Sequence, residues 1–230
     1  MSRGLGDVYK RQHTLIGNNG LTIGDLASFW QAIAKEFSTF KNIYGYGLMN
    51  EPHDLTPETS WFDMAQASIN AIREVDTNTL IMVGGNDWSS AERWIEQSDT
   101  LKYLKDPANN LAFEAHVYFD KDASGTYKYS YEEEECYLEK GIDRVKPFVE
   151  WIKQNKFHGF IGEYGIPDND PRWNETLDLF LGYLQENGIN GTYWAAGPWW
   201  DSYFMAITPK DGKDRPQMPI IEKYTSTFKK

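Results

Sequence analysis

Strand-like runs alternate with helix-like runs along most of this 230-residue chain, and this alternation constrains the fold more than any other feature. Short apolar runs predict five strands, at residues 43–49, 79–85, 111–119, 159–165 and 191–197. Helical spacing of apolar residues predicts helices at 26–37, 61–75, 91–97, 141–155 and 175–188, the first with Asp25 as its N-cap. Strands that alternate with helices in this way are typical of parallel βα units. The sequence therefore predicts an α/β fold.

Polar and aromatic residues follow each of the predicted strands, where a folding argument alone would not place them. They are Asn50 with Glu51, Asn86 with Trp88, His116 with Tyr118, Glu163 with Tyr164, and Trp194. In parallel α/β barrels the C-terminal ends of the strands form one rim. These side chains are therefore predicted to converge on one active site.

Composition narrows the class of ligand. The chain has 34 acidic and 23 basic residues, a net charge of -11, which argues against nucleic acid or an anionic membrane as partner. Aromatic residues make up 15%, with nine Trp, and flat apolar rings suit sugars, although Trp as simple core filler is the alternative. No apolar run reaches the ~18 residues of a membrane span, and the single Cys136 excludes an internal disulfide.

Two glutamates at strand ends, Glu51 and Glu163, suggest glycoside hydrolysis, which needs two carboxyl groups across the scissile bond. Each has a structural alternative, because Asn-Glu-Pro also occurs in helix-capping turns and Glu163 could pair with a buried Arg. Glu114 is a third candidate, but it lies one step deeper in its strand. Motifs of serine hydrolases, phosphate-binding loops and zinc proteases are absent from the sequence.

Four ordered motifs carry a resemblance to a known family. "GLMNEPHD", "HVYFDKDASGTY", "GFIGEYG" and "YWAAGPWW" resemble the cellulase family of glycoside hydrolases, family 5, in its endo-β-1,4-glucanase branch. The resemblance runs from about residue 14 to the C-terminus. It implies a (β/α)8 TIM barrel, a retaining double displacement, and neither a metal nor another cofactor.

The resemblance also implies a role for each site residue. Glu51 corresponds to the acid/base after strand four, and Glu163 to the nucleophile after strand seven. The substrate-binding residues would be Asn50, which binds the sugar 2-hydroxyl, His116 and Tyr118 on strand six, and Trp194, the platform under the sugar. Weaker candidates for flanking sugar subsites are Trp88, Trp199 and Trp200.

The position of Glu51 indicates that part of the barrel is missing. A (β/α)8 barrel takes about 250 residues, so a strand-four glutamate is expected beyond position ~95. The expected fold is therefore an incomplete barrel with about strands four to eight, lacking strands one to three. Residues 1–12 read as a non-native segment, and 13–230 as the C-terminal part of a catalytic barrel.

The function expected from these observations is that of a retaining endo-β-1,4-glucanase acting on cellulose-type β-glucans, weak or inactive as this truncated chain. A related β-mannanase or mixed-linkage glucanase is an alternative, as is a non-catalytic glucan-binding remnant. The parent is expected to be a secreted, extracellular monomer that binds β-glucan, although no signal peptide opens this chain.

Overall fold

The structure, a computed structural model, describes residues 16, 20–55, 59–200 and 202–225. The predicted non-native segment 1–12 lies outside the described residues, and its boundary stays a prediction. Contacts within the chain define two compact units. The first unit extends to Glu114 and also includes Asn155–His158; the second comprises Ala115–Gln154 and the residues from Gly159 onward.

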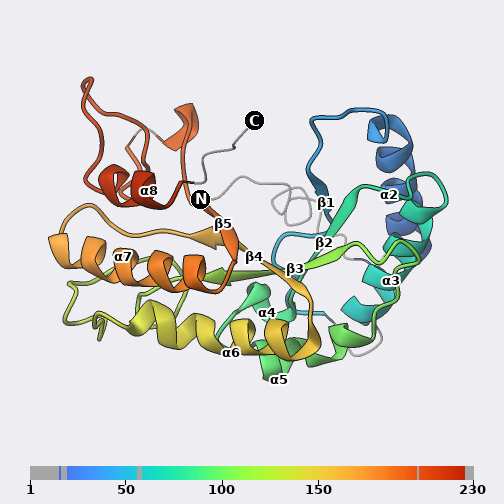
Figure 1. The fold of residues 1–230 in the computed structure, drawn as a ribbon, viewed down its shortest axis with the longest axis horizontal. Coiled ribbons are helices and arrows are strands. Elements are labelled where there is room, and N and C mark those ends of the chain that lie inside the picture. The colour runs from blue at the N-terminus through green and yellow to red at the C-terminus, as the bar shows by residue number, and fades with distance from the viewer. Residues whose placement is uncertain (1–15, 17–19, 56–58, 201, 226–230) are drawn as a thin grey trace. The chain divides into compact units, whose positions relative to one another are not determined.

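The strands follow one another in the sheet in the same order as in the chain (Figure 1). They are β1 (Gly45–Gly47), β2 (Leu80–Gly84), β3 (Leu111–Val117), β4 (His158–Tyr164) and β5 (Asn190–Tyr193). The pairs β1–β2, β2–β3 and β4–β5 are parallel. A sheet in chain order, with helices between its strands, is the pattern of consecutive βα units. It confirms the prediction of an incomplete (β/α)8 barrel with five strands.

In the described part of the first unit the helical segments are α2 (Ile23–Phe37), α3 (Trp61–Arg73), α4 (Asn86–Ser89), α5 (Trp94–Ser98) and the 3₁₀ segment η1 (Asp99–Tyr103). The helix α2 begins three residues before the predicted start, so the prediction of Asp25 as its N-cap is wrong. Thr22 caps the helix instead: its hydroxyl accepts the Asp25 N–H at 3.2 Å, and the Asp25 carboxylate accepts the Thr22 N–H at 2.7 Å. This reciprocal capping box explains the acidic residue at that position.

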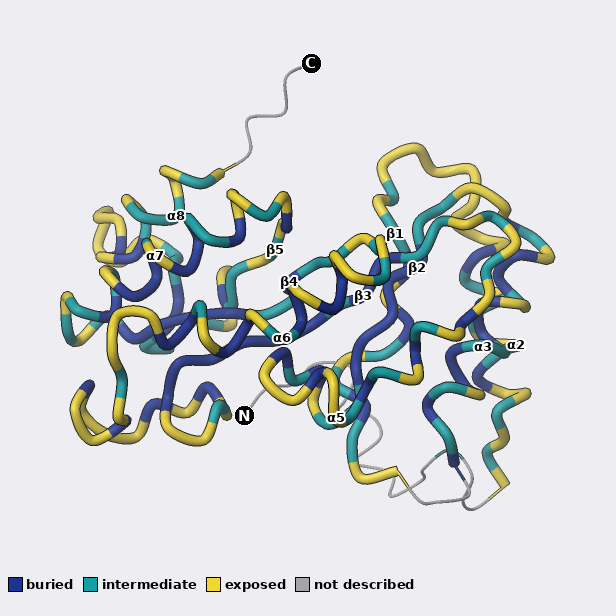
Figure 2. Tube along the Cα trace, turned by 60° about the horizontal axis from the view of Figure 1, so that its bottom comes forward, coloured by how far each residue is buried: buried dark blue, intermediate teal, exposed yellow. Residues whose placement is uncertain are grey.

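The core of the first unit lies between α3 and the strands β2 and β3. Fully or nearly fully buried side chains there include Trp61, Met64, Ile69, Ile72, Ile81, Val83 and Phe113. Figure 2 shows β2 as a buried stretch, as expected for a parallel strand covered on both faces. The Trp61 indole N–H donates to the Gly84 carbonyl at 2.7 Å, which fixes α3 against the end of β2.

The second unit contains α6 (Lys140–Asn155, except its last residue), α7 (Pro171–Glu186), the 3₁₀ segment η2 (Pro198–Trp200) and α8 (Met218–Tyr224). Its buried core includes Phe119, Phe148, Trp151, Ile161, Trp173 and Phe180. The helix α7 starts earlier than predicted because the Asp170 side chain caps it and Pro171 occupies its first turn. Among the described helices, none is long and apolar enough to cross a bilayer.

Candidate active site

Glu51 follows the end of β1 in the first unit. The ladder between strands continues past β1, because the Leu48 N–H donates to the Met82 carbonyl at 3.0 Å. Glu51 then takes a left-handed backbone conformation, with φ at 48°. A bulky residue there costs on the order of 1–3 kcal/mol, and such strain recurs at functional sites. Asn50 beside it is exposed, and Glu51 is partly exposed.

A glycine lets the turn after β1 approach β2 closely. A Cβ atom on Gly84 would lie 3.0 Å from the Met49 carbonyl oxygen and 3.6 Å from Pro52 Cδ. Pro52 is buried, and its carbonyl accepts the Trp88 N–H at 3.3 Å. The Asn-Glu-Pro turn is thus held from both sides, and the backbone that carries Glu51 is fixed.

Trp88 stands after β2, where its indole stacks on the His53 imidazole with ring centroids 4.5 Å apart and 14° between the planes. The side chain stays 42% exposed. Asp87, Trp88 and Ser89 all have positive φ values, and Arg93 binds the Asp87 carboxylate at 2.7 Å. The ring is therefore held at the surface of the first unit, as a sugar-binding platform requires, and its predicted role stays a prediction.

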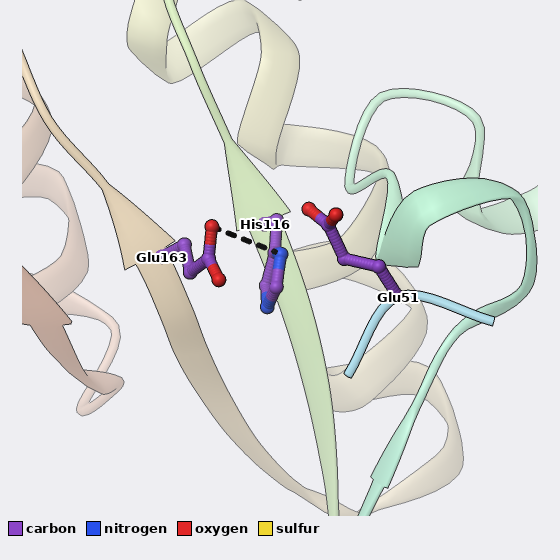
Figure 3. Close-up of side chains that lie close together, drawn as sticks. All are labelled: Glu51, His116 and Glu163. Carbon is purple, nitrogen blue, oxygen red and sulfur yellow. Dashed lines mark ion pairs between the residues drawn. The ribbon is translucent and has the colours of Figure 1, made fainter. Parts of the chain in front are cut away.

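Glu163 is the central group of the second unit. The Tyr118 hydroxyl donates to its Oε2 at 2.8 Å, and His116 Nδ1 lies 3.7 Å from the same oxygen, the ion pair drawn as a dashed line in Figure 3. His116 and Tyr118 are two residues apart along β3 and its extension, so they share one face. Tyr118 and His116 thus both lie against the Glu163 carboxylate, and their roles as site residues stay predictions.

The surroundings of Glu163 are largely closed to water. Tyr118 and His116 are 7% and 5% exposed, and the Glu163 side chain is 15% exposed. The Tyr118 hydroxyl thus donates to a largely desolvated carboxylate, where water cannot readily replace it.

Trp194 follows β5, and its N–H donates to the Tyr164 carbonyl at 2.8 Å. The peptide bond between Trp194 and Ala195 is cis. The Trp194 ring packs edge-on against the Trp200 ring, with the ring centroids 4.9 Å apart. The Trp199 side chain is 84% exposed. Trp194 and Trp200 thus form one aromatic group, and Trp199 projects into solvent.

Tyr203 belongs to this group and was missed by the sequence analysis. Its ring lies 4.9 Å from Trp200. Burial raises its pKa to about 12, and the charge of Glu163 acts in the same direction, so the phenol stays neutral. Tyr203 sits in an irregular segment after η2, and no periodicity in the sequence marks such a position.

Among the described residues, Glu51 in the first unit and His116 and Glu163 in the second carry atom types that metal ions bind. Their chemistry serves acid–base and nucleophilic catalysis equally well. The expectation that no metal is used stays a prediction.

The Glu163 carboxylate lies at the end of β4 with Tyr118 and His116 against it, and it is a group of the kind that glycoside hydrolysis needs. Residues 7–199 match the family described as Cellulase (glycosyl hydrolase family 5). The chain belongs to this family, which confirms the resemblance seen in the sequence.

Similar proteins of known name are endoglucanases. Endo-beta-1,4-glucanase B of Emericella nidulans is 36% identical over 193 residues, 82% of this chain and 56% of that protein. The Pseudomonas stutzeri endoglucanase Cel5A, solved in complex with cellobiose, is 41% identical with a TM-score of 0.86, over 93% of this chain and 64% of that one. XacCel5A in complex with cellopentaose is 38% identical with a TM-score of 0.81, over 91% and 68%. The chain thus spans little more than half of its curated relative.

Proposed function

We propose that this chain is part of a retaining endo-β-1,4-glucanase in which Glu163 is the nucleophile and Glu51 the acid/base. The observation that carries the proposal is the Glu163 carboxylate, with the Tyr118 hydroxyl at 2.8 Å and His116 at 3.7 Å. Membership of family 5 and the endoglucanase names of its relatives support it.

The proposed reaction has two steps. Glu163 attacks the anomeric carbon while Glu51 gives its proton to the glycosidic oxygen, so the sugar–oxygen bond breaks and a glycosyl-enzyme ester forms. Glu51 then takes a proton from water, whose oxygen attacks the same carbon and releases Glu163. This mechanism requires the two carboxyl groups ~5–5.5 Å apart.

The remaining site residues are proposed to bind the glucan. Asn50 would bond the 2-hydroxyl, His116 and Tyr118 would hold the nucleophile, and Trp194 would lie under the sugar at the cleavage point. Trp88, Trp199 and Trp200 are proposed for flanking subsites. Relatives solved with cellobiose and cellopentaose support a linear β-1,4-glucan as the ligand.

Two alternatives remain as named hypotheses. The same chemistry could act on mannan or mixed-linkage glucan instead of cellulose. Comparing the hydrolysis rates on carboxymethylcellulose, mannan and barley glucan would distinguish these substrates. A non-catalytic glucan-binding remnant is favoured by one observation, the 84% exposure of Trp199.

Because the chain spans 56% of one relative and 64% of another, we expect weak or no hydrolysis from it alone. The parent is proposed to be extracellular.

Covalent trapping tests the proposal on this chain. A cellobioside with fluorine at C2 and a 2,4-dinitrophenolate leaving group forms a slowly hydrolysed ester with a nucleophilic carboxylate and needs little acid catalysis. Intact-mass spectrometry of the purified chain should show one added fluorocellobiosyl group, and peptide mapping should place it on Glu163. Prior dialysis against EDTA should leave the trapping rate unchanged, because no metal is proposed.

Two variants separate the roles. Glu163→Gln should abolish trapping, whereas Glu51→Gln should retain it, because the activated leaving group departs without a proton. Label on another carboxylate, or equal loss in both variants, would contradict the assignment. Binding of cellopentaose without any label would favour the glucan-binding remnant.

A further inference from the structure

The loop at residues 120–127, which follows the β3 extension in the second unit, is organised by a single buried carboxylate. Asp120 is fully buried. It accepts the backbone N–H groups of Gly125, Thr126 and Tyr127 at 3.0, 3.0 and 3.2 Å, and the Ser124 hydroxyl at 3.1 Å. A carboxylate that collects several successive N–H groups locks the loop in one conformation. The loop is therefore a rigid element and can position what it touches.

Gly125 places this loop against the ring of Tyr118. A Cβ atom on Gly125 would lie 2.9 Å from both Cδ1 and Cε1 of Tyr118, closer than real Cβ contacts allow. The backbone of Gly125 also has φ at +71°, a conformation that favours glycine. The loop backbone thus covers one face of the ring whose hydroxyl binds Glu163.

Tyr127 joins the chain segments that follow Tyr118 and Glu163. Its hydroxyl accepts the Phe119 N–H at 2.8 Å and donates to the Gly165 carbonyl at 2.6 Å. Phe119 is the residue after Tyr118, and Gly165 lies two residues after Glu163. Tyr127 is 7% exposed, so water cannot readily replace either bond. One phenol therefore ties together the two backbones that carry the hydrogen-bonded pair.

We propose that Tyr127 and Gly125 are positioning residues that hold the Tyr118 hydroxyl in line with the Glu163 carboxylate. Both act through Tyr118 and the backbone. This inference rests on the proposed role of Glu163 as nucleophile. It adds the Asp120–Tyr127 loop to the parts of the fold that determine how fast Glu163 reacts.

Tyr127→Phe tests the bond between the two segments. Tyr131→Phe is the matched control, because Tyr131 is also buried, packs on the same Trp173 ring, and loses one buried hydrogen bond, to Thr176. With the fluorinated cellobioside, Tyr127→Phe should lower the maximal trapping rate on the order of 10- to 100-fold with little change in inactivator affinity. Tyr131→Phe should leave both constants within about twofold of those of the unmodified chain.

Gly125→Ala tests the contact with the ring. Gly188→Ala is its control, because Gly188 has φ at +66° but nothing within 4 Å of its added Cβ, so both variants share the backbone strain. Only Gly125→Ala should slow trapping. Equal effects of the two glycine variants, or an unchanged trapping rate in Tyr127→Phe, would overturn the inference.

If the unmodified chain is not trapped, that result contradicts the proposed function. Crystal structures of the variants then still test the inference about Tyr127 and Gly125. In Tyr127→Phe and in Gly125→Ala, the distance from the Tyr118 hydroxyl to Glu163 Oε2 should exceed 3.5 Å, the limit of a hydrogen bond. A retained distance near the present 2.8 Å in both variants would show that the loop does not position the pair.

Discussion

Single residues with several hydrogen-bond donors around them carry much of the order in this chain, and Asp76 is a clear case. Its Oδ1 accepts the N–H groups of Asn78 and Thr79, both at 2.9 Å, and its Oδ2 accepts the hydroxyls of Thr79 and Tyr46 at 2.6 and 2.9 Å. Burial works to raise the pKa of this carboxyl, but the four donors outweigh burial and lower the pKa to about 2. Ionised Asp76 therefore stabilises the folded state.

The sign of this contribution sets a pH window. An unfolded aspartate has a pKa of about 3.9, so the stabilisation is complete above pH ~4 and is lost as pH falls toward 2. Its size is on the order of 2 kcal/mol. In Asp76→Asn, the free energy of unfolding from urea titrations should be lower at pH 7 and should fall less between pH 4 and 2. An unchanged pH dependence in the variant would show that Asp76 does not carry this linkage.

The residue scale also shows what sequence can reveal about a site. Glu163, His116 and Tyr118 were predictable as a group because they end neighbouring predicted strands, and strand alternation fixes the face they share. Tyr127 and Tyr203 could not be predicted from the sequence. Their contacts depend on irregular loops, with Tyr127 itself at a φ of 42°, and no repeating pattern in the sequence encodes such a conformation.

At the scale of elements, a buried ion pair joins the end of α3 to the segment before β3. Arg73 donates from Nε and Nη2 to the two Asp106 oxygens at 2.7 and 3.0 Å, with side chains only 4% and 2% exposed. Its Nη1 also donates to the carbonyls of Asp76 and Thr79 at 3.0 and 2.8 Å. One guanidinium thus fixes the α3 C-terminus against the starts of two strands.

Removing one partner of this ion pair should destabilise the folded chain more than replacing both partners by apolar residues. Asp106→Ala leaves a buried charge without its counterion and should lower the free energy of unfolding by ~3–5 kcal/mol. The double variant Arg73→Met with Asp106→Leu should lose less than Asp106→Ala alone, as measured by urea denaturation at pH 7. A double variant that loses the sum of both single changes would argue against a coupled pair.

Elements were predicted better than their boundaries. Each of the five strands was predicted within a few residues, because apolar runs bounded by turn residues are a strong local signal. The start of α2 was misplaced because both Thr22 and Asp25 are residue types that suit a helix N-cap. Only the reciprocal hydrogen bonds in the structure show that Thr22 is the N-cap and Asp25 the third helical residue. The helix α8, which has seven residues, was not predicted.

At the scale of the whole molecule, the incomplete barrel predicts a specific biochemical deficit. The chain covers 64% of Pseudomonas stutzeri Cel5A. Placing the N-terminal barrel units of that enzyme ahead of residue 20, in place of the strands expected to be missing, should raise hydrolysis of carboxymethylcellulose into the range of ~1–10³ per second. The same fusion carrying Glu163→Gln is the control. If the unfused chain already turns over at such a rate, the deficit does not exist.

The division of the chain into two units has a consequence for its inheritance. The boundary between the two units falls within β3, between Glu114 and Ala115. Residues Asn155–His158 belong to the first unit, although the residues on either side of them belong to the second. Neither unit is a continuous stretch of sequence. A single recombination breakpoint in the gene therefore cannot separate the two units cleanly, because every cut leaves residues of one unit joined to the other.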